Sequence, residues 1–83
     1  MEFRIADTFI ESLAKLTLDG QKLAKTTAFD LQTNCTNPAM KLHKLDRAQD
    51  RNFWSVRVSS DLRMIIHKTD ASFLLCYVDH HDN

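Results

Sequence analysis

The chain has 83 residues, no net formal charge and an apolar content of 43%, values that fit one small globular domain with a modest core. No apolar run approaches the roughly 20 residues of a membrane-spanning helix, and the first residues lack the apolar segment of a signal peptide. We therefore expect a single cytoplasmic domain over residues 1–83 with no membrane partner. A partner chain or a homodimer would add stability to so small a domain.

The charges are unevenly distributed along this neutral chain. Residues 41–68 contain seven Lys or Arg and three Asp, whereas residues 1–40 contain four basic and five acidic residues and residues 69–83 three acidic ones. Nucleic-acid affinity arises largely from phosphate neutralisation, so the neutral total argues against strong nucleic-acid binding. The basic charge is nevertheless concentrated in the segment that should form the exposed surface of the sheet. Cys35 and Cys76 lack a CxxC spacing, and we interpret them as unpaired thiols of a cytosolic protein.

The N-terminal half shows the pattern of a short strand followed by two helices. Residues 2–6 alternate apolar and polar side chains, as a half-buried strand does. Apolar residues then recur at helical spacing, which predicts helices over about residues 8–16 and 18–33. Asp7 and Thr17 stand where these helices need N-caps. Small residues would let the two helices approach each other closely: Gly20, Ala24 and Ala28.

The hydrophobic period changes from 3.6 to 2 after the loop-forming residues 34–38, which marks a change from helices to strands. A weak strand is predicted around Leu42, followed by an exposed polar loop over about residues 46–52. Three clear strands are predicted after it, over about residues 53–58, 62–67 and 72–79. The last strand is apolar on both faces, so we expect it to lie inside the sheet.

This order of elements predicts an α+β fold, in which a short N-terminal strand and a two-helix hairpin pack with an antiparallel β-meander. Strand alternation places one set of side chains beneath the helices: Trp54, Val56, Val58, Leu62, Met64 and Ile66. Arg57, Arg63 and His67 alternate with that set and should face the other way. Trp54 would stack on a base instead if the faces were exchanged. We interpret Tyr77 as a packed residue, and the alternative is that its side chain lines the open face of the sheet.

Two kinds of side chain point to chemistry on phosphodiesters. His80 and His81 directly follow the last apolar strand, and imidazole is the side chain best suited to transfer protons near neutral pH. Arg57 and Arg63 stand on neighbouring predicted strands, and a guanidinium is a planar fork for a phosphate. Together they indicate RNA cleavage or phosphodiester binding. The alternatives are a solvated tail for the histidines and surface ion pairs for the arginines.

The acidic residues near these candidates define the remaining alternatives. Asp61 or Asp79 would be the ion-pair partners of the arginines. The run Asp-His-His-Asp over residues 79–82 contains potential metal ligands, but adjacent positions on a strand point to opposite faces. We therefore expect neither a metal nor another cofactor.

Several segments, taken in order, resemble the RelE/ParE toxin superfamily of type II toxin–antitoxin systems. The resemblance covers nearly the whole chain and lies in ADTFIESL at 6–13, LHKL at 42–45, FWSVRV at 53–58, DLRMII at 61–66 and LCYVDHH at 75–81. The order is also similar to RelE-like modules at the front of some superfamily I helicases. The resemblance implies the fold predicted above and a concave, basic sheet face that holds mRNA in the ribosomal A site.

The resemblance also implies roles for individual residues and a partner. Arg57 and Arg63 match positions that bind the phosphate and stabilise its transition-state charge. His81 matches a proton-transfer position of the YoeB branch, with His80 as an adjacent substitute. A cognate antitoxin is implied, which wraps the toxin with a partly disordered chain that folds on binding. The further candidates for RNA or phosphate contact are Lys41, Lys44 and His67.

Such a toxin would be a metal-independent endoribonuclease that uses the 2′-hydroxyl of the RNA as its nucleophile. His81 or His80 would transfer the protons, and Arg57 and Arg63 would stabilise the charge on the phosphorane.

The chain also departs from the family pattern. The glutamate of the YoeB branch falls at about Ala39, and the terminal tyrosine of active members falls near Asp82 or just beyond Asn83. The arginines and the histidine pair favour an mRNA-cleaving toxin that acts on the ribosome. The two departures favour a non-catalytic binding module, a gyrase-directed ParE-like toxin, or a degenerate copy that still binds an antitoxin.

Overall fold

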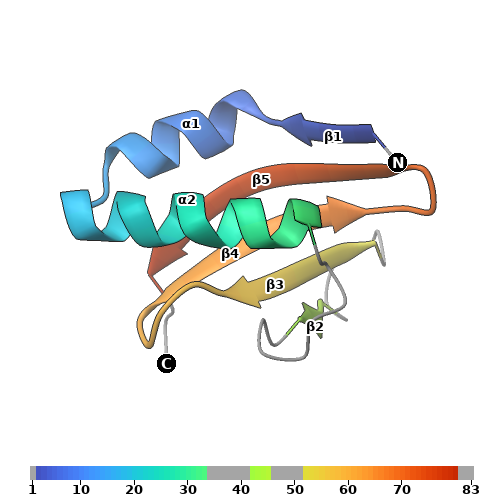
Figure 1. The fold of residues 1–83 in the computed structure, drawn as a ribbon. Helices are drawn as coiled ribbons and strands as arrows, with labels where there is room; N and C mark the ends of the chain where they lie inside the picture. Colours follow the sequence, from blue (N-terminus) through green and yellow to red (C-terminus); the bar gives the residue numbers. More distant parts are fainter. Residues whose placement is uncertain (1, 34–41, 46–51, 81–83) are drawn as a thin grey trace.

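The computed structural model describes residues 2–33, 42–45 and 52–80. Strand β1 (Glu2–Ile5) leads into helices α1 (Asp7–Ala14) and α2 (Leu18–Thr33). The remaining strands are β2 (His43–Lys44), β3 (Phe53–Arg57), β4 (Leu62–Lys68) and β5 (Ser72–His80). Both helices lie over the same face of the sheet (Figure 1), so the predicted α+β architecture is confirmed. The loop predicted over residues 46–52 lies outside the described residues except for Asn52.

The described strands form one sheet in the order β1-β5-β4-β3-β2. Strands β2 to β5 are antiparallel neighbours, as the meander predicted. Strand β1 pairs in parallel with β5, where Phe3 lies opposite Phe73 and the two rings stack with centroids 5.5 Å apart. Strand β5 therefore has neighbours on both sides, as its apolar sequence predicted, and β4 occupies the middle of the sheet.

The hydrophobic core fills the space between the helices and the sheet. Phe9 of α1 and Ala24 and Leu31 of α2 meet the buried side chains of the strands. Of the residues predicted to lie beneath the helices, four are buried and two, Trp54 and Val58, are half-buried at the margin of the core. Because one face of β3 and β4 is committed to this core, the alternate residues of both strands lie on the opposite, open face.

The predicted N-cap is present in α2 and absent in α1. Thr17 Oγ1 accepts a hydrogen bond of 3.1 Å from the amide of Gly20, which satisfies one of the free donors of the first turn. Ala6 precedes α1 and makes no side-chain cap, and Asp7 is already helical, where its carboxylate suits the positive end of the helix dipole. Helix α1 ends at Ala14, before its predicted end, because the chain turns there toward the Thr17 cap. Neither helix is long and apolar enough to span a membrane, as far as the described residues show.

Gly20 brings α2 close to the sheet rather than to α1. The residue is buried, and a Cβ there would lie 3.4 Å from Cδ1 of Leu62 in β4. The same Cβ would lie 3.3 Å from the Cβ of Leu16 in the connection between the helices. Gly20 therefore permits a close approach of the start of α2 to β4 and to the preceding turn, and not the predicted approach of the two helices to each other.

A β-bulge in β5 changes which of its side chains face the helices. Adjacent residues of β4 pair with Tyr77 and with Leu75, so Cys76 is an extra residue on β5. A bulge of this kind shifts the alternation by one position: Leu75 is buried before it and Val78 after it. Tyr77 consequently lies on the open face with 44% of its surface exposed, which corrects its interpretation as a packed residue. His80 is turned to the helix side.

Helix α1 holds this bulge in place through two hydroxyl groups. The Thr8 hydroxyl donates to the carbonyl oxygen of Cys76 at 2.5 Å, and the Ser12 hydroxyl accepts from the amide of Val78 at 3.0 Å. A bulge leaves backbone groups without partners in the strand ladder, and buried groups of this kind need another partner. The position of α1 therefore determines which residues of β5 reach the open face.

Candidate nucleic-acid interface on the open sheet face

The register of the strands arranges the open face in three rows. The first row holds Arg57, Arg63 and Asp79. The second row holds His43, Ser55, Ile65 and Tyr77. The third row holds Phe53, His67, Leu74 and Arg4. Successive rows are about 7 Å apart because each lies two residues farther along the strands.

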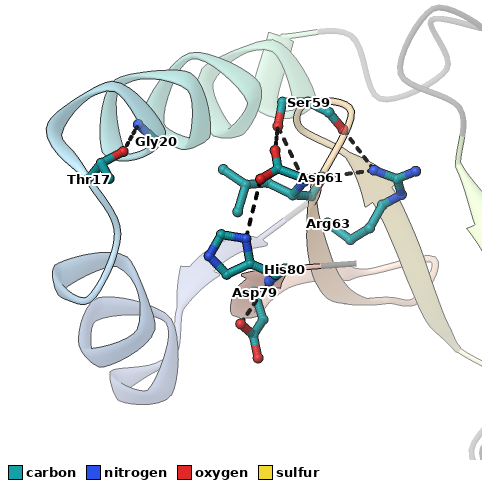
Figure 2. Close-up of polar contacts among 8 residues, drawn as sticks. Thr17, Gly20, Ser59, Asp61, Arg63, Asp79 and His80 are labelled. Atoms are coloured by element: carbon teal, nitrogen blue, oxygen red, sulfur yellow. Dashed lines mark hydrogen bonds and ion pairs between the residues drawn. The ribbon is translucent and has the colours of Figure 1, made fainter. Parts of the chain in front are cut away.

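Arg57 and Arg63 are direct cross-strand partners, so the structure brings these two predicted phosphate ligands together. Neighbouring strands are about 5 Å apart, so the two side chains start close enough together for both guanidinium groups to reach one phosphate. Arg63 Nη1 donates to the carbonyl oxygens of Ser59 at 2.8 Å and Leu62 at 3.0 Å. These bonds hold its guanidinium against the β3–β4 turn (Figure 2), whereas Arg57 is exposed.

Neither arginine of the pair forms an ion pair in the part of the chain that the structure describes. No carboxylate there lies within 4.0 Å of either guanidinium, so the ion pairs with Asp61 or Asp79 are not formed. Asp79 stands opposite Arg63, but its Oδ1 accepts a hydrogen bond of 2.7 Å from the backbone amide of His80. Like charges directly opposite each other destabilise a sheet. A bound phosphate would offset that repulsion.

His80 points away from the arginine pair. Its Nδ1 lies 3.4 Å from Oδ2 of Asp61 in the β3–β4 turn (Figure 2). Asp61 also accepts a hydrogen bond of 2.9 Å from the hydroxyl of Ser59. The Ser59 bond, with a smaller contribution from His80, lowers the pKa of the Asp61 carboxyl because both favour its ionised form. His81 lies outside the described residues.

The other predicted RNA contacts are spread over the sheet. His67 lies on the open face two rows from the arginines, and its ring packs edge-on against Phe53 with centroids 4.8 Å apart. Lys44 stands opposite Trp54 and therefore lies on the helix side. Lys41 is outside the described residues. The arginine pair is thus the part of the predicted site that the structure assembles.

A hollow of about 330 Å³ opens beside Arg63 on this face. The Tyr77 ring offers a surface on which a base could stack, and Ser55 offers a hydroxyl. Ser55 was not among the predicted site residues, although strand alternation places it on the same face as Arg57. Tyr77 was predicted to be packed, because the bulge that turns it to this face has no signal in the local sequence. The hollow is lined by Leu45, Ser55, Arg63, Ile65, Tyr77, Asp79 and His80.

The described residues contain no group of three His, Cys, Asp or Glu side chains placed to hold a metal ion. Burial raises the pKa of the Cys76 thiol, since a buried site disfavours the thiolate. That thiol is therefore a poor nucleophile. Among the described residues, this face carries guanidinium, imidazole, phenol and carboxylate groups.

Comparisons with known proteins agree with this architecture. No protein-family model matches the sequence, and no curated protein matches it. Among solved structures, the chain is similar to the RelBE2 toxin–antitoxin complex from Mycobacterium tuberculosis, with a TM-score of 0.75 and 22% identity over 99% of this chain and 92% of that one.

Two further structures show the same similarity. YafQ from E. coli strain BL21(DE3) has a TM-score of 0.79 and 17% identity over 96% of this chain and 92% of that one. The YoeB/ParE toxin from Agrobacterium tumefaciens has a TM-score of 0.74 and 9% identity over 99% of this chain and 100% of that one. The chain therefore has the fold of the RelE/ParE toxins, which the resemblance in its sequence implied.

Proposed function

We propose that the protein is the toxin of a type II toxin–antitoxin pair and that it inhibits translation by cleaving mRNA on the ribosome. The fold shared with structures described as RelE–RelB, YafQ and YoeB/ParE supports the toxin role. The observation that carries the RNA target is the arginine pair, Arg57 and Arg63, adjacent on an open sheet face and without a carboxylate partner among the described residues. Two planar forks at this spacing suit a phosphodiester.

Cleavage at this pair would use the RNA's own 2′-hydroxyl. The 2′-oxygen would attack the adjacent phosphorus to form a cyclic phosphate, and the bond to the 5′-oxygen would break. Arg57 and Arg63 would stabilise the charge that develops on the phosphorane oxygens. His81 remains our candidate for proton transfer. His43 in the neighbouring row and Asp79 beside Arg63 are further groups on this face that can exchange protons.

A non-catalytic or gyrase-directed toxin of the same fold is the second candidate function. The observation that favours it is the position of His80, whose imidazole contacts Asp61 instead of the arginines. The row that Arg57 shares with Arg63 and Asp79 contains no imidazole among the described strands. A toxin of this kind would bind its target and arrest growth without cutting mRNA.

Inducible expression in bacteria separates these functions. The wild-type chain should arrest growth and translation and leave mRNA with new 5′ ends, whereas Arg57→Gln and His81→Ala should not. Lys25→Gln is the matched control, because it removes an exposed cation from α2, far from the open face in sequence and fold. Arrest with intact mRNA would favour the second candidate. Normal growth on wild-type expression would contradict the toxin role.

A cognate antitoxin is the proposed protein partner. The helices expose Ile10, Leu18 and Phe29, which are 55%, 84% and 64% exposed, and exposed apolar side chains of this kind suit a partner surface. We expect a small acidic protein encoded in the adjacent reading frame to copurify with the chain and to restore growth. Light scattering of the isolated chain would show whether it forms a homodimer instead.

A further inference from the structure

Two lysines surround one indole ring on the helix side of the sheet. Lys44 of β2 stands opposite Trp54 of β3, and its Nζ lies 5.9 Å from the centroid of the indole ring. Lys68 of β4 reaches the same ring, with its Nζ 5.8 Å from the centroid. The indole is half-buried: it packs against the core and still reaches the surface. The open face and its arginine pair lie on the other side of the sheet.

The charges of this cluster are not neutralised in the described part of the chain. No carboxylate there lies within 4.0 Å of either ammonium group. The three side chains line a hollow of about 370 Å³ together with Asn52, Thr69 and Asp70. A cation–π contact orients an ammonium group over a ring, but it leaves the positive charge in place. The hollow therefore presents two cations beside a partly exposed aromatic surface, with the Asp70 carboxylate in its lining but more than 4.0 Å from both ammonium groups.

This combination matches the way in which proteins bind single-stranded nucleic acid. Cationic side chains contact the backbone phosphates, and an aromatic ring stacks on a base without requiring a particular sequence. A purely structural role would need only the indole in the core. In that role the two cation–π contacts would add a modest stabilisation, whereas a nucleic-acid ligand would also use the two positive charges that these contacts leave in place.

The cluster is also continuous with the open face around the edge of the sheet. Strand β2 is an edge strand, and its two residues alternate: His43 shares the open face with Ser55, whereas Lys44 shares the helix side with Trp54. A chain of nucleotides that leaves the open face over this edge would pass from His43 to Lys44. It would then reach the indole and the second ammonium group.

We propose that Trp54, Lys44 and Lys68 form a second binding site for single-stranded RNA, in which a base stacks on the indole and the neighbouring phosphate contacts both ammonium groups. The identification of the ligand as RNA rests on the proposed function. The site itself is separate from the arginine pair, so the two can be tested independently. It would hold nucleotides beside the segment bound on the open face and lengthen the RNA footprint.

Tryptophan fluorescence reports directly on this site, because Trp54 is the single tryptophan of the chain. Titration of the purified full-length chain with an oligouridylate should quench this fluorescence, and added salt should weaken the binding. Lys44→Gln and Lys68→Gln should each weaken binding, and the double variant should lower the slope of log affinity against log salt by about 0.7, the value for one phosphate contact on a single strand. Lys25→Gln, which removes an exposed cation from α2, should change neither.

Substitution of the ring tests the stacking. With a labelled oligouridylate, anisotropy should show near wild-type affinity for Trp54→Phe and about tenfold weaker binding for Trp54→Leu. Should Trp54→Leu fail to fold, the two lysine variants keep the proposal testable. Absence of quenching, or quenching that both lysine variants leave unchanged, would overturn the site.

Two further arms distinguish the ligand and the site. Arg57→Gln should retain the quenching of Trp54 while it abolishes translational arrest, so a failure of the proposed function is separable from a failure of this site. Polyglutamate serves as the acidic-protein probe. Quenching by polyglutamate without quenching by oligouridylate would overturn the RNA assignment, because it would identify the ligand as an acidic protein segment.

Discussion

Replacing Arg57 with glutamine should stabilise the fold while it weakens the proposed mRNA cleavage. Arg57 and Arg63 are direct cross-strand partners, and the Arg63 guanidinium is held in place by two carbonyl oxygens. Like charges opposite each other cost a sheet about 0.2 to 1 kcal/mol. Arg57 is exposed, so its replacement removes this repulsion and sacrifices little packing. For a domain of this size, the gain corresponds to a rise in Tm of about 1 to 8 °C.

Thermal unfolding followed by circular dichroism tests this expectation. The gain should be present at low salt and should disappear at about 1 M salt, where the Debye length falls to about 3 Å. Arg4→Gln is the matched control: Arg4 Nη1 lies 3.8 Å from Glu2 Oε1, and loss of such a surface pair costs about 0 to 1 kcal/mol. A lower Tm for Arg57→Gln at low salt, or a gain that persists in 1 M salt, would refute the reasoning.

Three further predictions concern the scaffold around the site. Ser12→Ala leaves the buried amide of Val78 without its acceptor, so urea denaturation should show a loss of about 1 to 3 kcal/mol; no loss would contradict the proposed anchoring of the bulge. Thr17→Ala removes the cap on Gly20 and should cost about 1 kcal/mol in the same assay, whereas Thr17→Ser should retain most of it. Folding lowers the pKa of the Asp61 carboxyl below its ordinary value of 3.8. Ionised Asp61 therefore stabilises the fold above pH 3.8, and this contribution is lost as the pH falls through the lower pKa of the folded state. Asp61→Asn should therefore show a smaller loss of Tm than the wild type as the pH falls below 3.8, and identical pH profiles would contradict this linkage.

The open face of β3 and β4 could be predicted from the sequence because both strands alternate without interruption. Val56 and Met64 are buried, so Arg57 and Arg63 must face the other way. The strand–helix–helix pattern over residues 2–33 could be predicted in the same way, since helical spacing and the Thr17 cap are local signals.

The rest of the site depends on interactions that a local pattern does not encode. The bulge at Cys76 is fixed by hydroxyl groups of α1, distant in sequence, and it reverses the faces of Tyr77 and His80. Strand β2 has two residues, too few for alternation to show that Lys44 lies on the helix side. The parallel pairing of β1 with β5 likewise joins the two ends of the described chain.

The central claim is that the arginine pair binds the scissile phosphate of mRNA. Mapping of the 5′ ends of an mRNA on programmed ribosomes, with purified wild type, Arg57→Gln and Arg57→Lys, tests it most directly. We predict cleavage by the wild type, a rate about a hundredfold lower for Arg57→Gln, and an intermediate rate for Arg57→Lys, because an ammonium keeps the charge but lacks the planar fork. Equal cleavage by all three proteins, or none by the wild type, would contradict the claim.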